Sequence, residues 1–291
     1  MMQLATRAGR IVGYELVGPA DGVPIVAMHG TPGSRVTRFP IGDPYAAAGV
    51  RVLRFDRGGY GLSTRVPGRS VRDCVSDVAA LVDHLGWECF AVTGGSGGGP
   101  HALACGGLLP ERVTRVLIER SLAPFDADGL DWYEGMTDGN ISEFRAAEHG
   151  EDVLRAVVEP EAASILEQLG GDSAGLLGDT YDLADADVSA LSDDAVAREV
   201  RKMLREALRG GAEGWIDDDL AFVKPWGFDL RSITGPVVVR YGAADTLVPA
   251  AHGRWLVSHI PGAIEERDDD GHIGSIDPDE VTRQYSWLAG G

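Results

Sequence analysis

The sequence is poor in positive charge and has no long apolar run. Its 291 residues include 26 Lys and Arg against 45 Asp and Glu, which gives a formal charge of -19. This surplus of negative charge repels phosphate backbones and anionic lipid headgroups, so we expect neither nucleic acid nor a membrane surface as a partner. No apolar stretch approaches the ~20 residues of a membrane span, and residues 1–7 lack the apolar core of a secretory signal. We therefore expect a cytoplasmic protein.

Cysteine is also scarce, with Cys74, Cys89 and Cys105 as the full set. An odd number of cysteines without metal-ligand spacing predicts neither a disulfide framework nor a metal site. We therefore expect reduced, mostly buried thiols and no bound metal.

Apolar residues, by contrast, are plentiful: they make up 44% of the chain, which is enough for a substantial core. Short β-branched runs alternate with amphipathic segments, as is typical of βαβ units and a mainly parallel twisted sheet flanked by helices. The expected strands are residues 23–28, 50–55, 90–93, 113–118, 236–241 and 263–267. Apolar residues at helical spacing predict helices at 70–85 and 278–288. The predicted fold class is therefore α/β.

Strand signals are absent between residues 124 and 232, where the sequence becomes helical and acidic. We expect the helices there to break at one proline and two glycine pairs, namely Pro160, Gly170-Gly171 and Gly210-Gly211. Because strands resume afterwards, the pattern predicts an insertion between two halves of one sheet. The predicted core is residues 1–123 and 233–291, and the predicted insertion is residues 124–232.

The insertion holds a large share of the bulky apolar side chains of the chain. Most of them should simply pack the insertion onto the core. We expect a few to wall a substrate pocket, with Trp132, Trp215 and Trp226 as the candidates.

The most informative stretch is the glycine-rich turn Gly94-Gly95-Ser96-Gly97-Gly98-Gly99, which lies between an apolar strand and a helix-like segment. The pattern G-x-S-x-G places a serine on a sharp strand-to-helix turn, where its hydroxyl projects above the sheet. Side chains two residues before or after the serine would collide with the strand or the helix, so glycine occupies those positions. The stretch predicts a nucleophile elbow centred on Ser96.

Two other interpretations compete for the same glycines. A flexible linker has a similar composition, but a linker would not lie between a strand and a periodic helix. A dinucleotide-binding turn is the stronger alternative, because Gly97 to Ala102 matches G-x-G-x-x-G/A and Glu119 follows about twenty residues later. Pro100 at the start of the helix argues against it, as does the position of the motif far from the start of the chain.

A series of motifs in a fixed order resembles the α/β-hydrolase superfamily, in particular its capped serine hydrolases. Besides the elbow, these motifs are His29-Gly30-Thr31-Pro32-Gly33-Ser34, Asp56-Arg57-Gly58-Gly59-Tyr60-Gly61-Leu62-Ser63, the loop from Tyr241 to Pro249, and Gly271-His272-Ile273. In the second motif Gly58 replaces the usual proline, a change that touches no catalytic atom. The resemblance implies an α/β-hydrolase fold in which residues 124–232 form a helical cap, or lid, over the sheet.

A serine hydroxyl needs a base within hydrogen-bond reach, and the base needs a carboxylate to fix its tautomer. In the family that the chain resembles, these residues follow in the order serine, acid, histidine. The resemblance therefore implies Ser96 as nucleophile, Asp245 as acid and His272 as base. Glu119, at the end of the strand after the elbow helix, is the alternative acid. The run Asp268 to Asp270 is close to His272 in sequence but is expected to be solvated.

The tetrahedral intermediate of acyl transfer carries negative charge on an oxygen, and two backbone N–H groups would stabilise it. The resemblance implies that the N–H groups of Thr31 and Gly97 form this oxyanion hole. It also implies that His29 and Gly30 support the oxyanion loop.

The residues and the resemblance together predict a serine hydrolase that cleaves an ester or related acyl bond of a small to medium apolar molecule, without a cofactor. The alternatives are an aminopeptidase of the proline-iminopeptidase type, a thioester, lactone or carbon–carbon bond hydrolase, and a weakly catalytic protein that binds a small ligand. A dinucleotide-dependent oxidoreductase is a more remote alternative. The sequence determines neither the substrate nor the oligomeric state.

Overall fold

A computed structural model describes residues 2–38, 42–169, 183–274 and 277–291. Its strands form one sheet in the order β1-β2-β4-β3-β5-β6-β7-β8. The strands are β1 (Met2–Ala5), β2 (Ile11–Val17), β3 (Val23–Met28), β4 (Val50–Phe55), β5 (Phe90–Gly95), β6 (Val113–Glu119), β7 (Val237–Gly242) and β8 (Ile264–Asp268). From β4 to β8 the strands pair in parallel, whereas β1 and β2 add an antiparallel edge. The predicted α/β class is confirmed.

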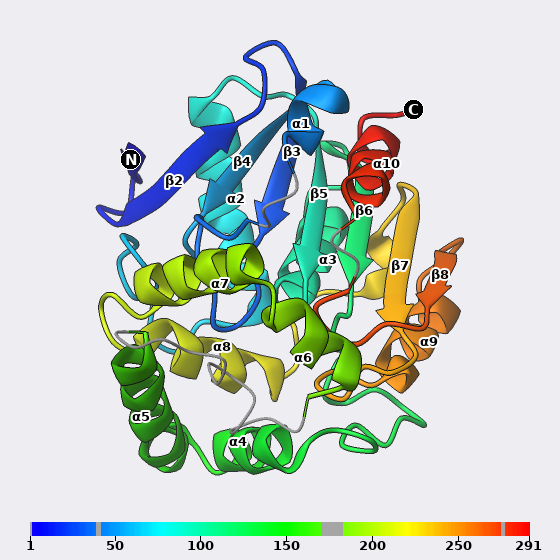
Figure 1. The fold of residues 1–291 in the computed structure, drawn as a ribbon. Coiled ribbons are helices and arrows are strands. Elements are labelled where there is room, and N and C mark those ends of the chain that lie inside the picture. Colours follow the sequence, from blue (N-terminus) through cyan, green and yellow to red (C-terminus); the bar gives the residue numbers. More distant parts are fainter. Residues whose placement is uncertain (1, 39–41, 170–182, 275–276) are drawn as a thin grey trace.

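Helices cover both faces of the sheet (Figure 1). The core helices are α1 (Pro44–Ala47), α2 (Cys74–His84), α3 (Gly98–Leu108), α9 (Ala250–His259) and α10 (Pro278–Leu288), with short 3-10 turns η1 (Val71–Asp73) and η2 (Leu230–Ser232). One apolar cluster packs α2, α3 and α9 against one face of the sheet, and a second packs α1 and α10 against the other. The central strands are buried on both faces, which explains why they are apolar without alternation.

The six predicted strands are all present, with their ends shifted by at most two residues. Sequence patterns did not reveal β1 and β2. β1 is short and mostly exposed, so it has no apolar run to detect. In β2, Gly13 interrupts the apolar pattern; glycine is required there because Leu62 and Asp56 occupy the space that a side chain would need. The helix predicted at 70–85 is present as η1 followed by α2.

Between β6 and β7 the regular elements of the described residues are helices, in the region that we call the cap segment (residues 124–232). Its helices are α4 (Asp138–Glu148), α5 (Glu151–Gln168), α6 (Asp185–Leu191), α7 (Asp194–Ala207) and α8 (Glu213–Phe222). They lie across the carboxyl ends of the parallel strands (Figure 1). Among the described residues, no helix has the length and apolarity needed to cross a membrane. The division of the chain into core and cap domains stays a prediction.

The break predicted at Pro160 is wrong, because α5 continues through this residue. Proline removes one N–H from the helix and leaves the carbonyl of Ala156 without its partner. Both residues face solvent, so water can satisfy that carbonyl, while Leu154 and Val158 hold the other side of the helix in the cap. The break at Gly210-Gly211 is present between α7 and α8, and the one at Gly170-Gly171 lies outside the described residues.

The three cysteines are free. Cys74 and Cys105 are buried, as expected, whereas Cys89 is exposed.

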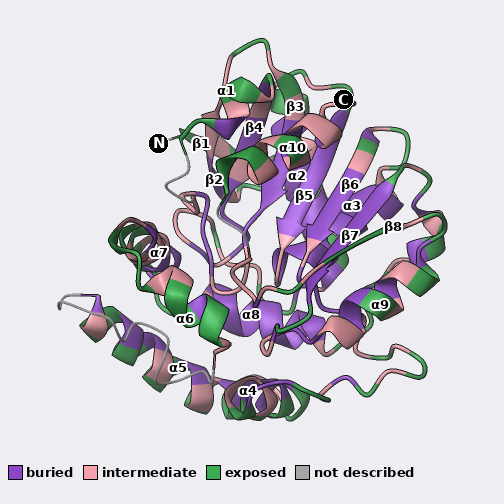
Figure 2. Ribbon diagram, turned by 45° about the vertical axis from the view of Figure 1, so that its right-hand side comes forward, coloured by how far each residue is buried: buried purple, intermediate pink, exposed green. Residues whose placement is uncertain are grey.

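Helix α8 is the layer between the rest of the cap segment and the core. All its residues from Gly214 to Phe222 are buried, and Figure 2 shows it as a continuous buried helix beneath the sheet. At its first turn, Gly214 packs on the ring of Tyr60: a Cβ added to Gly214 would lie 2.6 Å from ring atoms. Gly59 approaches the same turn, since its own Cβ would lie 2.8 Å from Gly214. This contact therefore tolerates only glycine at position 214.

We expect Gly214→Ala to destabilise the protein, because the added methyl group collides with a fully buried ring. Overpacking of this kind costs about 1–3 kcal/mol, which exceeds the ~1 kcal/mol that alanine gains over glycine in a helix. Gly210→Ala is the matched control, since nothing lies within 4 Å of a Cβ at that position. Urea unfolding should give a lower midpoint for the first variant and an unchanged or higher one for the second. Equal midpoints would contradict the packing described here.

Candidate active site

Four loops that follow parallel strands meet at one edge of the sheet. His29 follows β3, Ser96 follows β5, Asp245 follows β7 and His272 follows β8. Ligand sites of open α/β sheets lie at the carboxyl ends of strands, because loops of parallel strands converge there. A cavity of about 390 Å³ opens at this edge, beneath the cap segment. Ser96 and His272 both line it.

The Ser96 turn has the strand–turn–helix geometry expected of an elbow. Ser96 has a φ of 52°, a left-handed conformation that is rare for a residue with a side chain. Its N–H donates to the Glu119 carbonyl at 2.9 Å, which holds the turn against β6. A Cβ at Gly94 would lie 2.4 Å from the Gly98 carbonyl oxygen, and one at Gly98 would lie 2.6 Å from the backbone oxygens after β3. The flanking glycines are therefore required by close backbone packing.

His272 lies against Asp245. Its Nδ1 is 2.9 Å from Asp245 Oδ2 and 3.1 Å from Oδ1. The carboxylate is buried and held in place, because the N–H groups of Leu247 and Val248 both donate to its Oδ1 at 2.9 Å. Nδ1 therefore carries the proton that faces the carboxylate, and Nε2 is left as the basic nitrogen. Among the described residues no hydrogen bond joins Ser96 to His272, a bond that often tightens only when substrate binds.

Glu119, the alternative acid, also lines the cavity but does not pair with His272. Its Oε1 accepts from Gln284 Nε2 at 2.9 Å, and Arg240 Nη1 lies 3.8 Å away. Burial raises the pKa of Glu119 above its usual value despite the nearby charges of Arg120 and Arg240. The structure therefore brings His272 to Asp245 rather than to Glu119.

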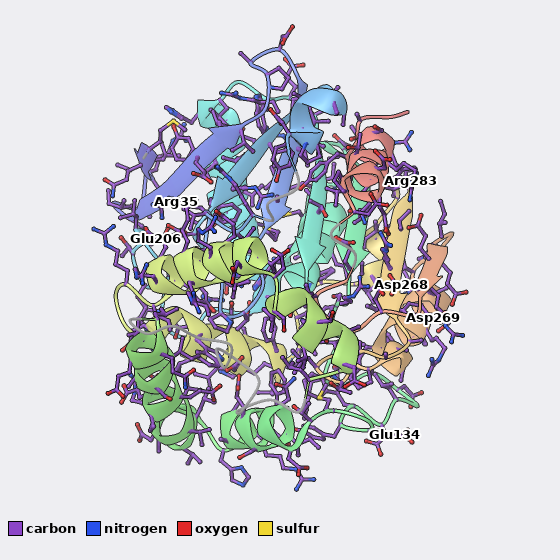
Figure 3. The ribbon with its side chains drawn as sticks, viewed as in Figure 1. Arg35, Glu134, Glu206, Asp268, Asp269 and Arg283 are labelled. Atoms are coloured by element: carbon purple, nitrogen blue, oxygen red, sulfur yellow. The ribbon has the colours of Figure 1, made fainter. Side chains whose placement is uncertain are left out.

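Two charged residues that sequence reasoning missed support the histidine loop. Asp187, on α6 of the cap segment, accepts from the N–H groups of His272 and Ile273 at 2.8 and 2.7 Å. Arg120 follows β6 and donates to the Gly271 carbonyl at 2.6 Å. It also pairs with both oxygens of Asp268 at 2.8 Å, so the expectation of a solvated Asp268 is wrong; the residue lies at the end of β8 (Figure 3).

In the loop after β3, both ring nitrogens of His29 have backbone partners. Its Nε2 accepts from the Arg57 N–H at 3.1 Å, which leaves Nδ1 to donate to the Gly30 carbonyl at 2.8 Å. Burial and the charge of Arg57 lower the pKa of His29 well below its usual range, so the ring is neutral. Thr31 and Gly97, the predicted oxyanion donors, are in close contact: a Cβ on Gly97 would lie 2.3 Å from Thr31 Oγ1.

A buried charge cluster lies beside this loop, centred on Asp218 of α8. Asp218 is fully buried, and the guanidinium groups of Arg57 and Arg69 approach its oxygens at 2.5 and 2.6 Å. Although burial raises the pKa of the Asp218 carboxyl, these two charges lower it well below its usual range. His101 has an oxygen at each ring nitrogen, Val71 O at 3.0 Å and Asp218 Oδ1 at 3.2 Å, as expected for a protonated ring.

A second link joins the cap segment to the loop after β3. Arg35 is buried and pairs with Asp56 at 2.5 Å and with Glu206 of α7 at 2.7 Å (Figure 3). Ser34 Oγ donates to the Met203 carbonyl of the same helix at 3.0 Å. The loop is therefore held from the core on one side and from the cap on the other.

Of the three candidate pocket tryptophans, Trp215 lines the cavity. Trp132 and Trp226 are outside its lining, so for these two the expectation is wrong. Trp132 packs among Phe144, His252 and neighbouring aromatic rings, and its Nε1 donates to the Ala123 carbonyl. Trp226 stacks on Phe228. Trp132 and Trp226 therefore pack against other aromatic rings, as bulky apolar side chains commonly do.

The cavity also has two buried carboxyl groups in its wall, Glu143 of α4 and Asp219 of α8. Trp215 Nε1 donates to Glu143 Oε1 at 2.7 Å. Glu143 and Asp219 share a hydrogen bond, and no other described residue donates to either oxygen of Asp219. Burial raises the pKa of Glu143 to about 7, and burial together with the charge of Glu143 raises that of Asp219 well above its usual value. The described residues contain no cluster of metal-ligating side chains.

One feature of the sequence indicates that Asp218 and Asp219 have a special role. The run Asp217-Asp218-Asp219 interrupts an otherwise apolar helix, and all three residues are buried. Buried charges occur where a partner or a ligand compensates them. The partners of Asp218 come from residues more than a hundred positions away, so the pattern alone does not identify them.

Comparisons with known proteins agree with this architecture. A family model described as "alpha/beta hydrolase fold" matches residues 23–279. An acetyltransferase component of the acetoin cleaving system from Pseudomonas putida is 29% identical over 87% of this chain and 60% of its own length. A proline iminopeptidase from Xylella fastidiosa is 33% identical over 41% of this chain and 39% of its own length. The chain thus spans less than two thirds of each of these two relatives.

A solved structure of a thermophilic esterase from Thermogutta terrifontis aligns with a TM-score of 0.68 at 21% identity, over 99% of this chain and 98% of that one. At this identity the likeness shows the fold. The family match accounts for the glycines around Ser96 without a dinucleotide, and it covers the strands and loops that carry all the candidate residues. On this match and this topology, the chain belongs to the alpha/beta hydrolase fold family.

Proposed function

We propose that this hydrolase acts through Ser96 on an ester or a related acyl bond. The observation that carries the proposal is that a serine in a left-handed turn and a histidine paired with a buried carboxylate open onto the same cavity. The fold alone would not fix this function, because members of one fold carry out different chemistry. The chemistry is inferred from the side chains.

In the proposed reaction, His272 Nε2 takes the proton from Ser96 as the hydroxyl oxygen attacks the acyl carbon. Asp245 keeps the ring oriented and stabilises the imidazolium that forms. The backbone N–H groups of Thr31 and Gly97 would stabilise the negative oxygen of the tetrahedral intermediate. His272 then gives its proton to the leaving alcohol, and water cleaves the acyl-enzyme by the same steps with the histidine again as base.

The cavity favours a small to medium organic molecule over a polymer. Its volume is about 390 Å³, within the range of small-molecule sites. Apolar side chains of the cap segment and of the loops supply much of its wall, among them Phe144, Trp215, Phe222, Met203 and Leu204. An acyl chain could be buried there, and burial of each CH₂ contributes about 0.8 kcal/mol.

A second candidate function is hydrolysis of substrates that carry an amine, as in an aminopeptidase. The observation that favours it is the Glu143–Asp219 carboxyl pair in the cavity wall. Apart from the hydrogen bond that it shares with Glu143, Asp219 has no donor among the described residues, and burial of a carboxyl with so few partners is costly. An ammonium group would supply the missing donors and displace a proton from the pair. The similarity to a proline iminopeptidase over part of the chain is consistent with this candidate.

Ser96 should be the serine labelled by a fluorophosphonate probe, because labelling requires the elbow and a neighbouring base. Peptide mass spectrometry should locate the adduct, and Ser96→Ala should remove it together with esterase activity. Ser258→Ala, on the exposed surface of α9, is the control and should label normally. An unlabelled wild-type protein, under conditions in which a known serine esterase reacts, would sink the proposed mechanism.

Asp245→Asn should lower kcat by a factor on the order of 10³–10⁴, because the imidazole loses the partner that fixes its tautomer. Glu119→Gln should change kcat little, since the glutamine can still bond Gln284 at the same position. Steady-state kinetics with thermal melts of both variants would separate lost catalysis from lost folding. The reverse ranking, with both variants folded, would transfer the role of acid to Glu119.

If the carboxyl pair binds an amine, kcat/KM should favour phenyl esters of aminoacyl chains over their des-amino counterparts at a matching chain length. The preference should fall as pH drops through about 7, where Glu143 becomes neutral. Asp219→Asn should reduce the preference, whereas Asp152→Asn removes an exposed charge from α5 and should not. No amine preference at any chain length would eliminate this candidate and leave the ester proposal standing.

A further inference from the structure

The Asp218 carboxylate accepts hydrogen bonds from five side chains. Besides Arg57, Arg69 and His101, it accepts from Tyr60 OH at 2.9 Å and from Thr31 Oγ1 at 2.6 Å. The last two donors share the same oxygen, Oδ2. Thr31 is the residue whose backbone N–H we assign to the oxyanion hole, so one cap carboxylate bonds directly to the oxyanion loop.

The Thr31 hydroxyl has a fixed orientation as a result. Its hydrogen is committed to Asp218, and its oxygen accepts from Arg57 Nη2 at 3.0 Å. The same Arg57 nitrogen donates to the Gly30 carbonyl at 2.9 Å. With the side chain held on both sides and the preceding carbonyl fixed, the peptide that carries the Thr31 N–H cannot rotate freely.

Gly97 shows that this side-chain position is tightly packed. The Thr31 hydroxyl leaves no room for a side chain at Gly97, because a Cβ there would lie only 2.3 Å from Thr31 Oγ1. The side chain therefore runs past the backbone of the second proposed donor on its way to the buried cluster. A threonine released from Asp218 could take another rotamer, and the two N–H groups would lose their fixed relation.

We propose that Asp218 is a positioning residue, which holds the Thr31 hydroxyl and thereby sets the direction of the Thr31 N–H toward the developing oxyanion. This inference rests on the proposed serine mechanism. Asp218 belongs to α8, so correct seating of this cap helix completes the oxyanion hole. The cap then does more than enclose substrate: it contributes to transition-state stabilisation through the loop that it contacts.

Asp218→Asn is a poor test, because it leaves Arg57 and Arg69 buried without their counter-charge and could unfold the chain. Thr31→Val is sharper: it keeps the shape of the side chain and the backbone N–H but removes the bond to Asp218. Thr31→Ser restores the hydroxyl. Tyr60→Phe is the matched control, because it removes a donor from the same oxygen of Asp218 and keeps the ring that packs against His29.

We expect Thr31→Val to lower kcat by about tenfold with little change in KM, less than the 10²–10³ of a fully lost donor. Its affinity for phenylboronic acid, which forms a tetrahedral adduct with an activated serine, should fall by a similar factor. Thr31→Ser should recover most of both values. Tyr60→Phe should lower the unfolding midpoint about as much as Thr31→Val does, while its kcat stays within about twofold of wild type.

The inference fails if Thr31→Val keeps wild-type kcat and boronate affinity, or if Tyr60→Phe loses as much kcat as Thr31→Val, since the cluster would then act only through stability. Either result is separate from failure of the serine mechanism itself. That mechanism is tested by labelling of Ser96 in the wild-type protein, which does not depend on Thr31 or Tyr60.

Discussion

A fully buried carboxylate must be neutralised, and Asp218 meets this requirement by drawing together parts of the chain that are far apart in sequence. Arg57 comes from the turn after β4, Arg69 from the segment before α2, and Thr31 from the loop after β3. Removing one partner from such a cluster costs about 3–5 kcal/mol, because a charge is left buried and unpaired. The position of α8 across the sheet edge and the conformation of the loop after β3 therefore depend on the same electrostatic requirement.

Some of the acidic residues of the chain have a structural role. Its net charge of -19 suggests a repulsive surface, yet some carboxylates of the cap segment are turned inward. Asp218 contacts Thr31 in the loop after β3, and Glu206 pairs with Arg35 of the same loop. Asp187 contacts the loop that carries His272. Each accepts from backbone or side-chain donors of a loop at the carboxyl edge of the sheet. The cap thus helps to hold the loops whose residues line the cavity.

The cavity wall shows the opposite case: there, two buried carboxyl groups have no cationic partner within the described part of the chain. Asp219 lies one helical position after Asp218 on α8 but faces the cavity, where its neighbour is Glu143 of α4. Successive helix positions point about 100° apart, so one carboxylate reaches the core and the next reaches the cavity. The difference in pKa direction between these two neighbours follows from this geometry: Arg57 and Arg69 stabilise the charge of Asp218, whereas Asp219 meets another carboxyl.

The sequence by itself determined the elements whose signals are local. The parallel strands, the Ser96 turn and the closing helix follow from apolar runs, glycine spacing and helical periodicity, and the resemblance of the loops supplied Asp245 and His272. Tertiary structure alone decided what depends on distant partners: Trp215 rather than Trp132 or Trp226 at the cavity, and a helix that continues through Pro160. The roles of Asp187 and Asp218 belong to the same group. A periodic pattern shows that a side chain is buried, but which donors neutralise it depends on chain segments that meet only when the sheet and the cap assemble.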